Sequence, residues 1–352
     1  MFGEGHDIVV IGASAGGVHA LLRIVEDLPR DLPAAVFVAV HSSPDSPSHL
    51  PELLSRRGAL SAAHALHGEE LLPGRIYVAP PDTHLAVRPR HVEVVRGPKE
   101  NGHRPSVDVL FRTASASHGP RVVGVVLTGE LDCGTAGLLS IKARGGLAIV
   151  QDPATAVAPS MPESAIAHRA ADHIVPLPEI GSLIGQLVST PAGLWPTTLP
   201  PAIARLEGTE LGDAAEVVCP ACQGNLTVAE QNGFEVFRCH VGHAFSLSTL
   251  VAEQAEHVER ALWAATRALE EAAFLSNRLR RTAASEDLRR RFEEKERAQL
   301  RDAEILRGLL TAPSLTVGDG HVVSEGIAKQ PKREEPRTQR EARGRQARPA
   351  KL

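Results

Sequence analysis

Aromatic and sulfur-containing residues are scarce in this chain of 352 residues. Phe, Trp and Tyr together make up 3% of the sequence, and there are only two Met and four Cys. Because 43% of the residues are hydrophobic, the chain can still bury a sizeable core, but that core must be built from Val, Leu, Ile and Ala. A chain of this length is expected to hold about two domains.

The sequence also lacks the features of membrane, secreted and nucleic-acid-binding proteins. No apolar run approaches the ~18 residues of a membrane-spanning helix, and no basic segment followed by a long apolar one opens the chain. The formal net charge is −4, and four cysteines are too few for a disulfide scaffold. We therefore expect a cytoplasmic protein with no membrane insertion and no nucleic-acid partner.

Residues 1–188 alternate short β-branched runs with helical patterns. The predicted strands are Ile8–Gly12, Ala35–Val40, Arg75–Ala79, Val122–Leu127 and Ala148–Val150. The predicted helices are Val18–Asp27, His49–Arg57, Val107–Ser117 and Ala136–Ala143. Leu85–Val95 alternates polar and apolar residues around Pro89-Arg90, which predicts a β-hairpin. Continuous apolar strands between helices indicate an α/β fold, a doubly wound and mostly parallel sheet with helices on both faces.

The remaining chain divides into four segments. Residues 189–216 are proline-rich and are predicted to be a linker. Residues 217–245 form a small cysteine-bearing module, and 246–311 are helical. Residues 312–352 are predicted to be a disordered basic tail, since positions 329–352 hold nine Lys and Arg against three Glu.

The helical segment carries a coiled-coil-like pattern. Small and aliphatic residues recur at steps of four and three, at Val251, Ala255, Val258, Leu262, Ala265, Leu269 and Ala272. This seam could pack within the chain, against a second copy or on a helical partner. Ser285-Glu286-Asp287 predicts the N-cap of a second helix, Leu288–Leu310.

Residues of types common in active sites follow three of the predicted strands. The first strand runs into a Gly-rich turn that holds Ser14, the second ends at His41, and a third is followed by Asp132. Because the carboxyl ends of parallel strands share one edge of a sheet, the three side chains suit a Ser-His-Asp arrangement. A dinucleotide site at the turn, or Ser14 as a simple helix cap, are the alternatives.

Three cysteines and a histidine have the spacing of a structural zinc site. Cys219 and Cys222 form a CxxC knuckle, and Cys239 is followed by His243, with His240 as the alternative fourth ligand. Leu226–Ala229 and Glu235–Arg238 are predicted strands joined by a turn at Asn232-Gly233, as in a zinc ribbon.

Six segments together resemble the catalytic domain of CheB-type protein-glutamate methylesterases. They are IVVIGASAGG (8–17), VAVHSSP (38–44), GRIYVAPPDTHLAV (74–87), GHRPSVDVLFRTAS (102–115), VVLTGELDCGTAGLLSIKARGG (125–146) and QDPATAVAPSMPESAI (151–166). The resemblance covers residues 7–187. It implies a doubly wound α/β domain that hydrolyses glutamyl methyl esters on chemoreceptors, releases methanol and in some members deamidates glutamine. It also implies that Ser14 and His41 belong to the catalytic triad and that catalysis needs no cofactor.

The chain departs from that family at the third triad residue. The family aspartate directly precedes a glycine, and here Cys133 stands before Gly134, with Asp132 one place earlier as the possible substitute. A neutral thiol does not orient the histidine as a carboxylate does. We expect Gly16 and Gly17 to allow close approach of the substrate, and Thr128, Gly129 and Glu130 to contribute to its binding site.

Two functions follow from the resemblance. The first is a methylesterase that acts on methylated chemoreceptors or related signalling proteins, with zinc as a structural metal. The second is a catalytically impaired scaffold that binds such partners, because Cys133 stands at the triad aspartate position. We further expect that no receiver domain precedes the strand at residue 8, and that the C-terminal helices could form a homo-oligomer.

Overall fold

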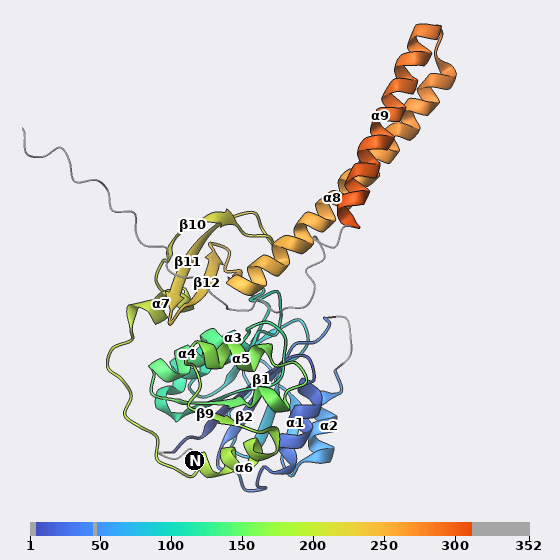
Figure 1. Ribbon diagram of the computed structural model, residues 1–352. Coiled ribbons are helices and arrows are strands. Elements are labelled where there is room, and N and C mark those ends of the chain that lie inside the picture. The colour runs from blue at the N-terminus through green and yellow to red at the C-terminus, as the bar shows by residue number, and fades with distance from the viewer. Residues whose placement is uncertain (1–4, 45–47, 312–352) are drawn as a thin grey trace, which may run out of the picture. The chain divides into compact units, whose positions relative to one another are not determined.

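The structure is a computed structural model that describes residues 5–44 and 48–311 (Figure 1). The predicted basic tail, 312–352, lies outside the described residues. No described helix is both long enough and apolar enough to cross a lipid bilayer.

A parallel sheet of seven strands occupies the first half of the chain, in the order β3-β4-β2-β1-β7-β8-β9. The strands are β1 (Ile8–Ala13), β2 (Ala35–Val40), β3 (Ser61–His64), β4 (Arg75–Val78), β7 (Val122–Val126), β8 (Leu147–Gln151) and β9 (His173–Val175). All five predicted strands are present, within one residue or so at each end. The sequence did not reveal β3 and β9, because these edge strands are short and only partly buried.

Helices cover both faces of this sheet (Figure 1). One face carries α1 (Gly17–Glu26), α2 (Leu50–Arg57) and α6 (Leu177–Leu187), and the other carries α3 (Val107–His118), α4 (Thr135–Ala143) and α5 (Ser160–Ala167). Alternate residues of β1 serve the two cores, since Val9 and Ile11 pack with the first group of helices and Ile8 and Val10 with the second. The predicted doubly wound fold is confirmed.

The predicted hairpin is also present. Strands β5 (His84–Val87) and β6 (Val92–Val95) pair in antiparallel register around Pro89-Arg90. Leu85 and Val92 join the same core as the helix α3.

The cysteine module is a four-stranded antiparallel sheet of β10 (Asp213–Val218), β11 (Asn225–Gln231), β12 (Phe234–Cys239) and β13 (Ala244–Ser246). The predicted turn at Asn232-Gly233 joins β11 to β12, and both residues have positive φ, 53° and 79°.

The predicted linker is more ordered than its composition indicated. It contains helix α7 (Pro201–Glu207), and β10 begins within it. Ile203 and Leu206 of α7 are buried in the same core as residues of α3, α4 and α5, and Glu207 pairs with Arg144 at 2.5 Å. Tertiary contacts therefore stabilise a helix too short for its own periodicity to be recognised.

Two long antiparallel helices follow, α8 (Leu247–Thr282) and α9 (Glu286–Leu310). Ser285 caps α9 as predicted, since its hydroxyl accepts a hydrogen bond from the N–H of Leu288. Of the seam predicted from the sequence, Val251 and Val258 are 49% and 44% exposed, whereas Leu262, Leu269 and Ala272 are half-buried. Small and polar residues, namely Thr266, Ala273, Ser276 and Ala303, are buried where the two helices pair.

Candidate functional site

The candidate site lies at the carboxyl ends of three neighbouring strands. Strand β1 pairs in parallel with β2 on one side and with β7 on the other. Ser14 follows β1, His41 follows β2, and the segment 128–134 follows β7. The chain winds outward in both directions from β1, and such a switch point is where open α/β sheets place their ligands.

Ser14 and His41 face one another, as predicted. The Nδ1 atom of His41 lies 3.2 Å from the Oγ atom of Ser14. Backbone hydrogen bonds fix both positions, because the N–H of Ser14 donates to Thr128 and the N–H of His41 donates to Ala13. Ser14 also lies two positions before Gly16, the N-cap of α1, and the backbone N–H groups and dipole at this end of the helix favour negative charge.

The imidazole of His41 is held between Ser14 and a second histidine. The ring of His103 stacks on it with centroids 3.6 Å apart and an interplanar angle of 9°. Burial, and then the proximity of His103, hold the pKa of His41 well below its usual range. The ring is therefore neutral at pH 7, which is the form that can accept a proton from a serine hydroxyl.

The opposite nitrogen of His41 has no acid beside it. Its Nε2 atom is buried and makes no hydrogen bond to any described residue. In a Ser-His-Asp triad a carboxylate occupies this place and orients the ring. Within the described part of the chain, the side chains of Asp132 and Cys133 both bind elsewhere.

The Asp132 carboxylate is held by the start of α8. It accepts a hydrogen bond of 2.5 Å from the hydroxyl of Ser246, which is itself the N-cap of that helix. Burial raises the pKa of Asp132, while hydrogen bonds from Ser246 and Ser248 oppose that rise. The carboxylate proposed as a substitute triad acid thus lies in a polar contact with the C-terminal part of the chain.

Cys133 is 2% exposed and lies against a different carboxylate. Its Sγ atom is 3.5 Å from Oδ2 of Asp108. The N–H of Gly134 donates to that same oxygen, and the N–H of Gly137 donates to Oδ1. Burial, and then the charge of Asp108, raise the pKa of the Cys133 thiol well above its usual range. The thiol is therefore protonated and cannot supply the missing negative charge.

The predicted substrate-binding residues surround Ser14, but several of them have packing roles. Thr128 is buried, and its hydroxyl donates to the carbonyl of Ala15 and accepts from the N–H of Ala158. A Cβ on Gly16 would lie 2.8 Å from Val157, and one on Gly17 would lie 2.5 Å from Ala13. These glycines thus let the turn pack tightly.

Gly129 and Glu130 differ in their surroundings. A Cβ on Gly129 would lie 2.9 Å from the Cβ of Ser14 and would overlap the sulfur of Met161. Glu130 is exposed beside the same turn. Of the five predicted substrate-binding residues, it is therefore the one whose side chain is available to solvent.

Sequence reasoning assigned no role to His103, Asp108, Asn101 or Ser246. His103 and Asp108 belong to the segment GHRPSVDVLFRTAS. Polar residues at the start of a predicted helix were the one sequence feature that could have indicated a role for them. Nothing in the sequence pairs Asn101 or Ser246 with this site, because Ser246 lies more than a hundred positions from Asp132.

The four predicted metal ligands come together in the second module. One ligand atom from each of Cys219, Cys222, Cys239 and His243 lies within 4.8 Å of the others. The Nδ1 atom of His243 is 3.5 Å from Sγ of Cys239, and Sγ of Cys222 is 3.6 Å from that same sulfur. Bonds of ~2.0–2.3 Å to a central tetrahedral ion would give similar separations, so the residues fit zinc. The structure groups His243, rather than His240, with the cysteines.

A doubly wound parallel sheet with a serine-histidine pair at its switch point defines the first half of the chain as an α/β domain. The sequence model of the CheB methylesterase family matches residues 9–184. The chain belongs to the CheB methylesterase family.

Named relatives and a solved structure agree with this assignment. Protein-glutamate methylesterase FrzG from Myxococcus xanthus is 39% identical over 184 residues, which are 52% of this chain and 55% of FrzG. A putative protein-glutamate methylesterase/protein-glutamine glutaminase from Leptospira interrogans is 37% identical over 183 residues, 95% of its length. The crystal structure of the Thermotoga maritima CheB methylesterase catalytic domain is 34% identical, with a TM-score of 0.51, and covers 52% of this chain and 98% of that domain. The chain thus spans about half the length of FrzG.

Proposed function

We propose that this protein hydrolyses glutamate methyl esters on chemoreceptors or related signalling proteins. The observation that carries the proposal is the 3.2 Å approach of Ser14 Oγ to the neutral imidazole of His41, at the switch point of a CheB methylesterase domain. Glutamine deamidation by the same chemistry is a second reaction of this site, because relatives are named for both activities.

The reaction uses the two side chains in turn. The Oγ atom of Ser14 attacks the ester carbonyl while His41 accepts the hydroxyl proton. His41 then returns that proton to the departing methoxide, so that methanol leaves and an acyl-serine remains. Water, deprotonated by His41, cleaves this acyl-serine to a glutamate carboxylate and free Ser14. Backbone N–H groups at the start of α1 are the candidate donors to the oxyanion.

A catalytically impaired scaffold is the second candidate, and a specific observation favours it. The Nε2 atom of His41 lacks a carboxylate partner among the described residues, because Asp132 binds Ser246 and position 133 is a cysteine. Loss of the triad carboxylate function costs about 10⁴-fold in rate in a well-studied protease.

Methanol release from methylated receptor fragments separates the two candidates. Release by the wild type that disappears in Ser14→Ala supports the esterase. Equal background from both proteins, with binding of the fragment retained in Ser14→Ala, supports the scaffold and contradicts the esterase. Ammonia release from glutamine-bearing fragments, measured in parallel, tests the deamidase reaction.

The cysteine module is proposed to hold structural zinc through Cys219, Cys222, Cys239 and His243. All four positions of a tetrahedral ion are taken by protein ligands, which is typical of a structural site. No cofactor takes part in the proposed ester hydrolysis. The protein is proposed to act in the cytoplasm, on the cytoplasmic part of its receptor.

The helical hairpin is proposed to mediate self-association. Phe274, Leu275 and Leu279 of α8 and Ile305 of α9 are each half-exposed or more, while small and polar residues fill the contact between the helices. Acidic and basic residues are equal in number, five of each in α8 and seven of each in α9. A second copy therefore meets no net charge repulsion and can cover the apolar side chains.

A further inference from the structure

One segment of the catalytic domain joins the metal-binding module directly to the serine-histidine pair. Residues 99–101 lie beside β13, where Ala244 and Glu100 form an isolated parallel bridge. The N–H of Asn101 donates to the carbonyl of Ala244 at 2.7 Å. The C-terminal module is thus continuous, through backbone hydrogen bonds, with the loop that leads to His103.

Asn101 is the centre of this junction. Its side-chain carbonyl accepts a 2.8 Å hydrogen bond from the N–H of Ser246, and its amide group donates at 3.0 Å to Oδ2 of Asp108. Its backbone carbonyl accepts a 2.5 Å hydrogen bond from Nδ1 of His103. Asn101 is 7% exposed, so all of these contacts are shielded from water.

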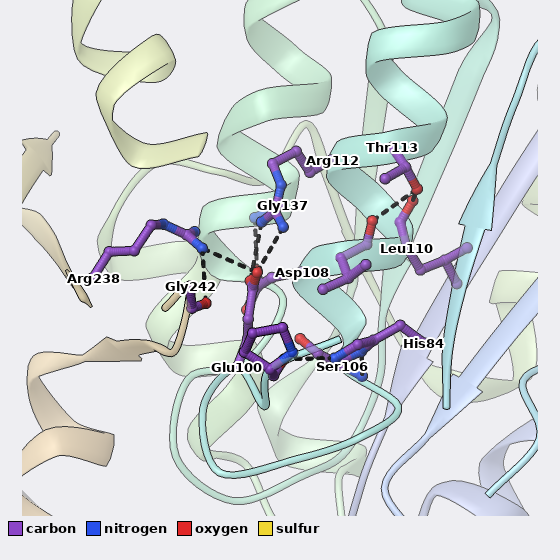
Figure 2. Close-up of polar contacts among 12 residues, drawn as sticks. His84, Glu100, Ser106, Asp108, Leu110, Arg112, Thr113, Gly137, Arg238 and Gly242 are labelled. Carbon is purple, nitrogen blue, oxygen red and sulfur yellow. Dashed lines mark hydrogen bonds and ion pairs between the residues drawn. The ribbon is translucent and has the colours of Figure 1, made fainter. Parts of the chain in front are cut away.

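A buried ion-pair cluster holds the neighbouring residue in place. The Glu100 carboxylate lies between Arg112 of α3, at 2.7 Å, and Arg238 of β12, at 3.1 Å (Figure 2). Burial alone would raise the pKa of Glu100, but the two guanidinium groups lower it to about 2. The segment is therefore anchored on both sides by charges that belong to different modules.

We propose that Asn101 is a positioning residue that sets the orientation of His41 through the stacked ring of His103, and that it ties this orientation to the docking of the C-terminal module. His103 has one fixed nitrogen, bonded to Asn101, and its ring face covers His41. Movement of the Asn101 loop would shift that ring and admit water to His41. Asn101 does not itself touch the reacting atoms.

The left-handed backbone of Asn101 permits a clean substitution. Its φ is 51°, a conformation that glycine adopts freely and alanine does not. Asn101→Gly therefore removes the side chain and keeps the backbone shape. Asn232, with φ 53° in the exposed β11–β12 turn, provides the matched control Asn232→Gly.

The test measures the ring titration of His41 by NMR in the full-length protein, assigned with His41→Gln. Ser14 and His103 contact the His41 ring, and neither residue is substituted in these variants. We expect Asn101→Gly to move the pKa of His41 upward by roughly one unit, since a loosened stack admits water. Asn232→Gly leaves it unchanged. Asn101→Ser strains this left-handed backbone and is compared with the equally strained Asn232→Ser, so an upward shift in Asn101→Ser alone decides the matter if Asn101→Gly does not fold.

The inference rests on the proposed function only in taking Ser14 and His41 as the reacting pair. A folded Asn101→Gly or Asn101→Ser protein with an unshifted His41 titration overturns it, even if ester hydrolysis is slower. Labelling of Ser14 by a fluorophosphonate gives a second readout, whose pH dependence should follow the shifted His41 titration. If the wild type releases no methanol, the NMR titration still decides the role of Asn101.

Discussion

Different interactions stabilise the N-terminal and the C-terminal half of the molecule. The catalytic domain buries aliphatic side chains on both faces of its sheet, and residues such as Val10, Ile11, Leu21 and Leu110 are 0–1% exposed. The cysteine module has a core cluster of only six buried residues, two of which, Cys219 and Cys239, are candidate metal ligands. The helical hairpin buries mainly small and polar residues. Hydrophobic burial can thus stabilise the first region alone, whereas we expect the second to need the proposed metal, ion pairs and its neighbours.

The largest expected effect on activity lies in the catalytic domain and leaves the fold intact. Ser14→Ala should lower ester hydrolysis by on the order of 10⁴-fold or more, because no nucleophile remains. His41→Gln should give a similar loss, and the double variant should be no slower than either single one. The measurement is methanol release, with thermal unfolding to confirm intact structure. Additive losses would contradict a pair that acts as a unit.

Metal removal should affect the stability of the two regions differently. A structural zinc site of this kind contributes about 10–16 kcal/mol of apparent binding free energy, so its loss should unfold the cysteine module. We expect Cys222→Ser, or a strong chelator, to abolish hydrogen-exchange protection in β11 and β12 and to leave that of β1 and β7 intact. Uniform loss of protection through both regions would show that they fold as one unit.

Acidification should act mainly on the catalytic domain. Burial, and then the charge of Arg121, lower the pKa of His118 from its usual value to about 4, and burial lowers the pKa values of His6 and His84 as well. Only the unfolded chain binds these protons readily, so stability should fall as pH drops from 6.5 towards 4. For His118 the loss is on the order of 3 kcal/mol.

Urea unfolding of the wild type and of His118→Gln, measured at pH 7 and pH 4.5, checks this dependence. The variant should lose less stability on acidification, since it lacks one proton-binding group in the unfolded state. Equal losses in the two proteins would exclude His118 as a source of acid sensitivity.

The docking of the two regions should depend on one buried arginine. Arg238→Met leaves Glu100 with Arg112 alone, which should destabilise the interface by about 2–3 kcal/mol. Arg260→Met, which removes an exposed ion pair with Glu256 on α8, is the matched control and should cost no more than about 0.5 kcal/mol. Protease sensitivity of the segment 189–200 reports the docking. Similar effects of both substitutions would argue against an anchoring role for Glu100.

The smallest effect is expected at the hairpin. Leu275→Asp places a charge on the exposed apolar surface of α8, and it should weaken self-association by about tenfold or more without unfolding the chain. Analytical ultracentrifugation over a concentration series measures the dissociation constant. Leu211→Asp, at an 87% exposed site outside the hairpin, is the control. A monomeric wild type would exclude the homo-oligomer.

The sequence correctly predicted the elements whose structure is determined by residues close together in the chain. The buried strands β1, β2 and β7 are continuous apolar runs, and Asn232-Gly233 forms the turn its residue types favour. The CxxC spacing predicted the cluster of three cysteines and a histidine for the same reason. Helix α7 and strands β3 and β9 were missed, because long-range packing stabilises them more than their own residues do.

Local pattern therefore determined the fold class, the serine-histidine pair and the cysteine cluster, since each follows from residues close together in the chain or from the common edge of parallel strands. Only the tertiary structure decided which groups the carboxylates near His41 contact. Asp132 binds Ser246, Asp108 lies under Cys133, and Nε2 of His41 has no partner among the described residues. The physical reason is that hydrogen bonds of a buried carboxylate depend on donors far away in sequence, which reach the site only when the modules pack together.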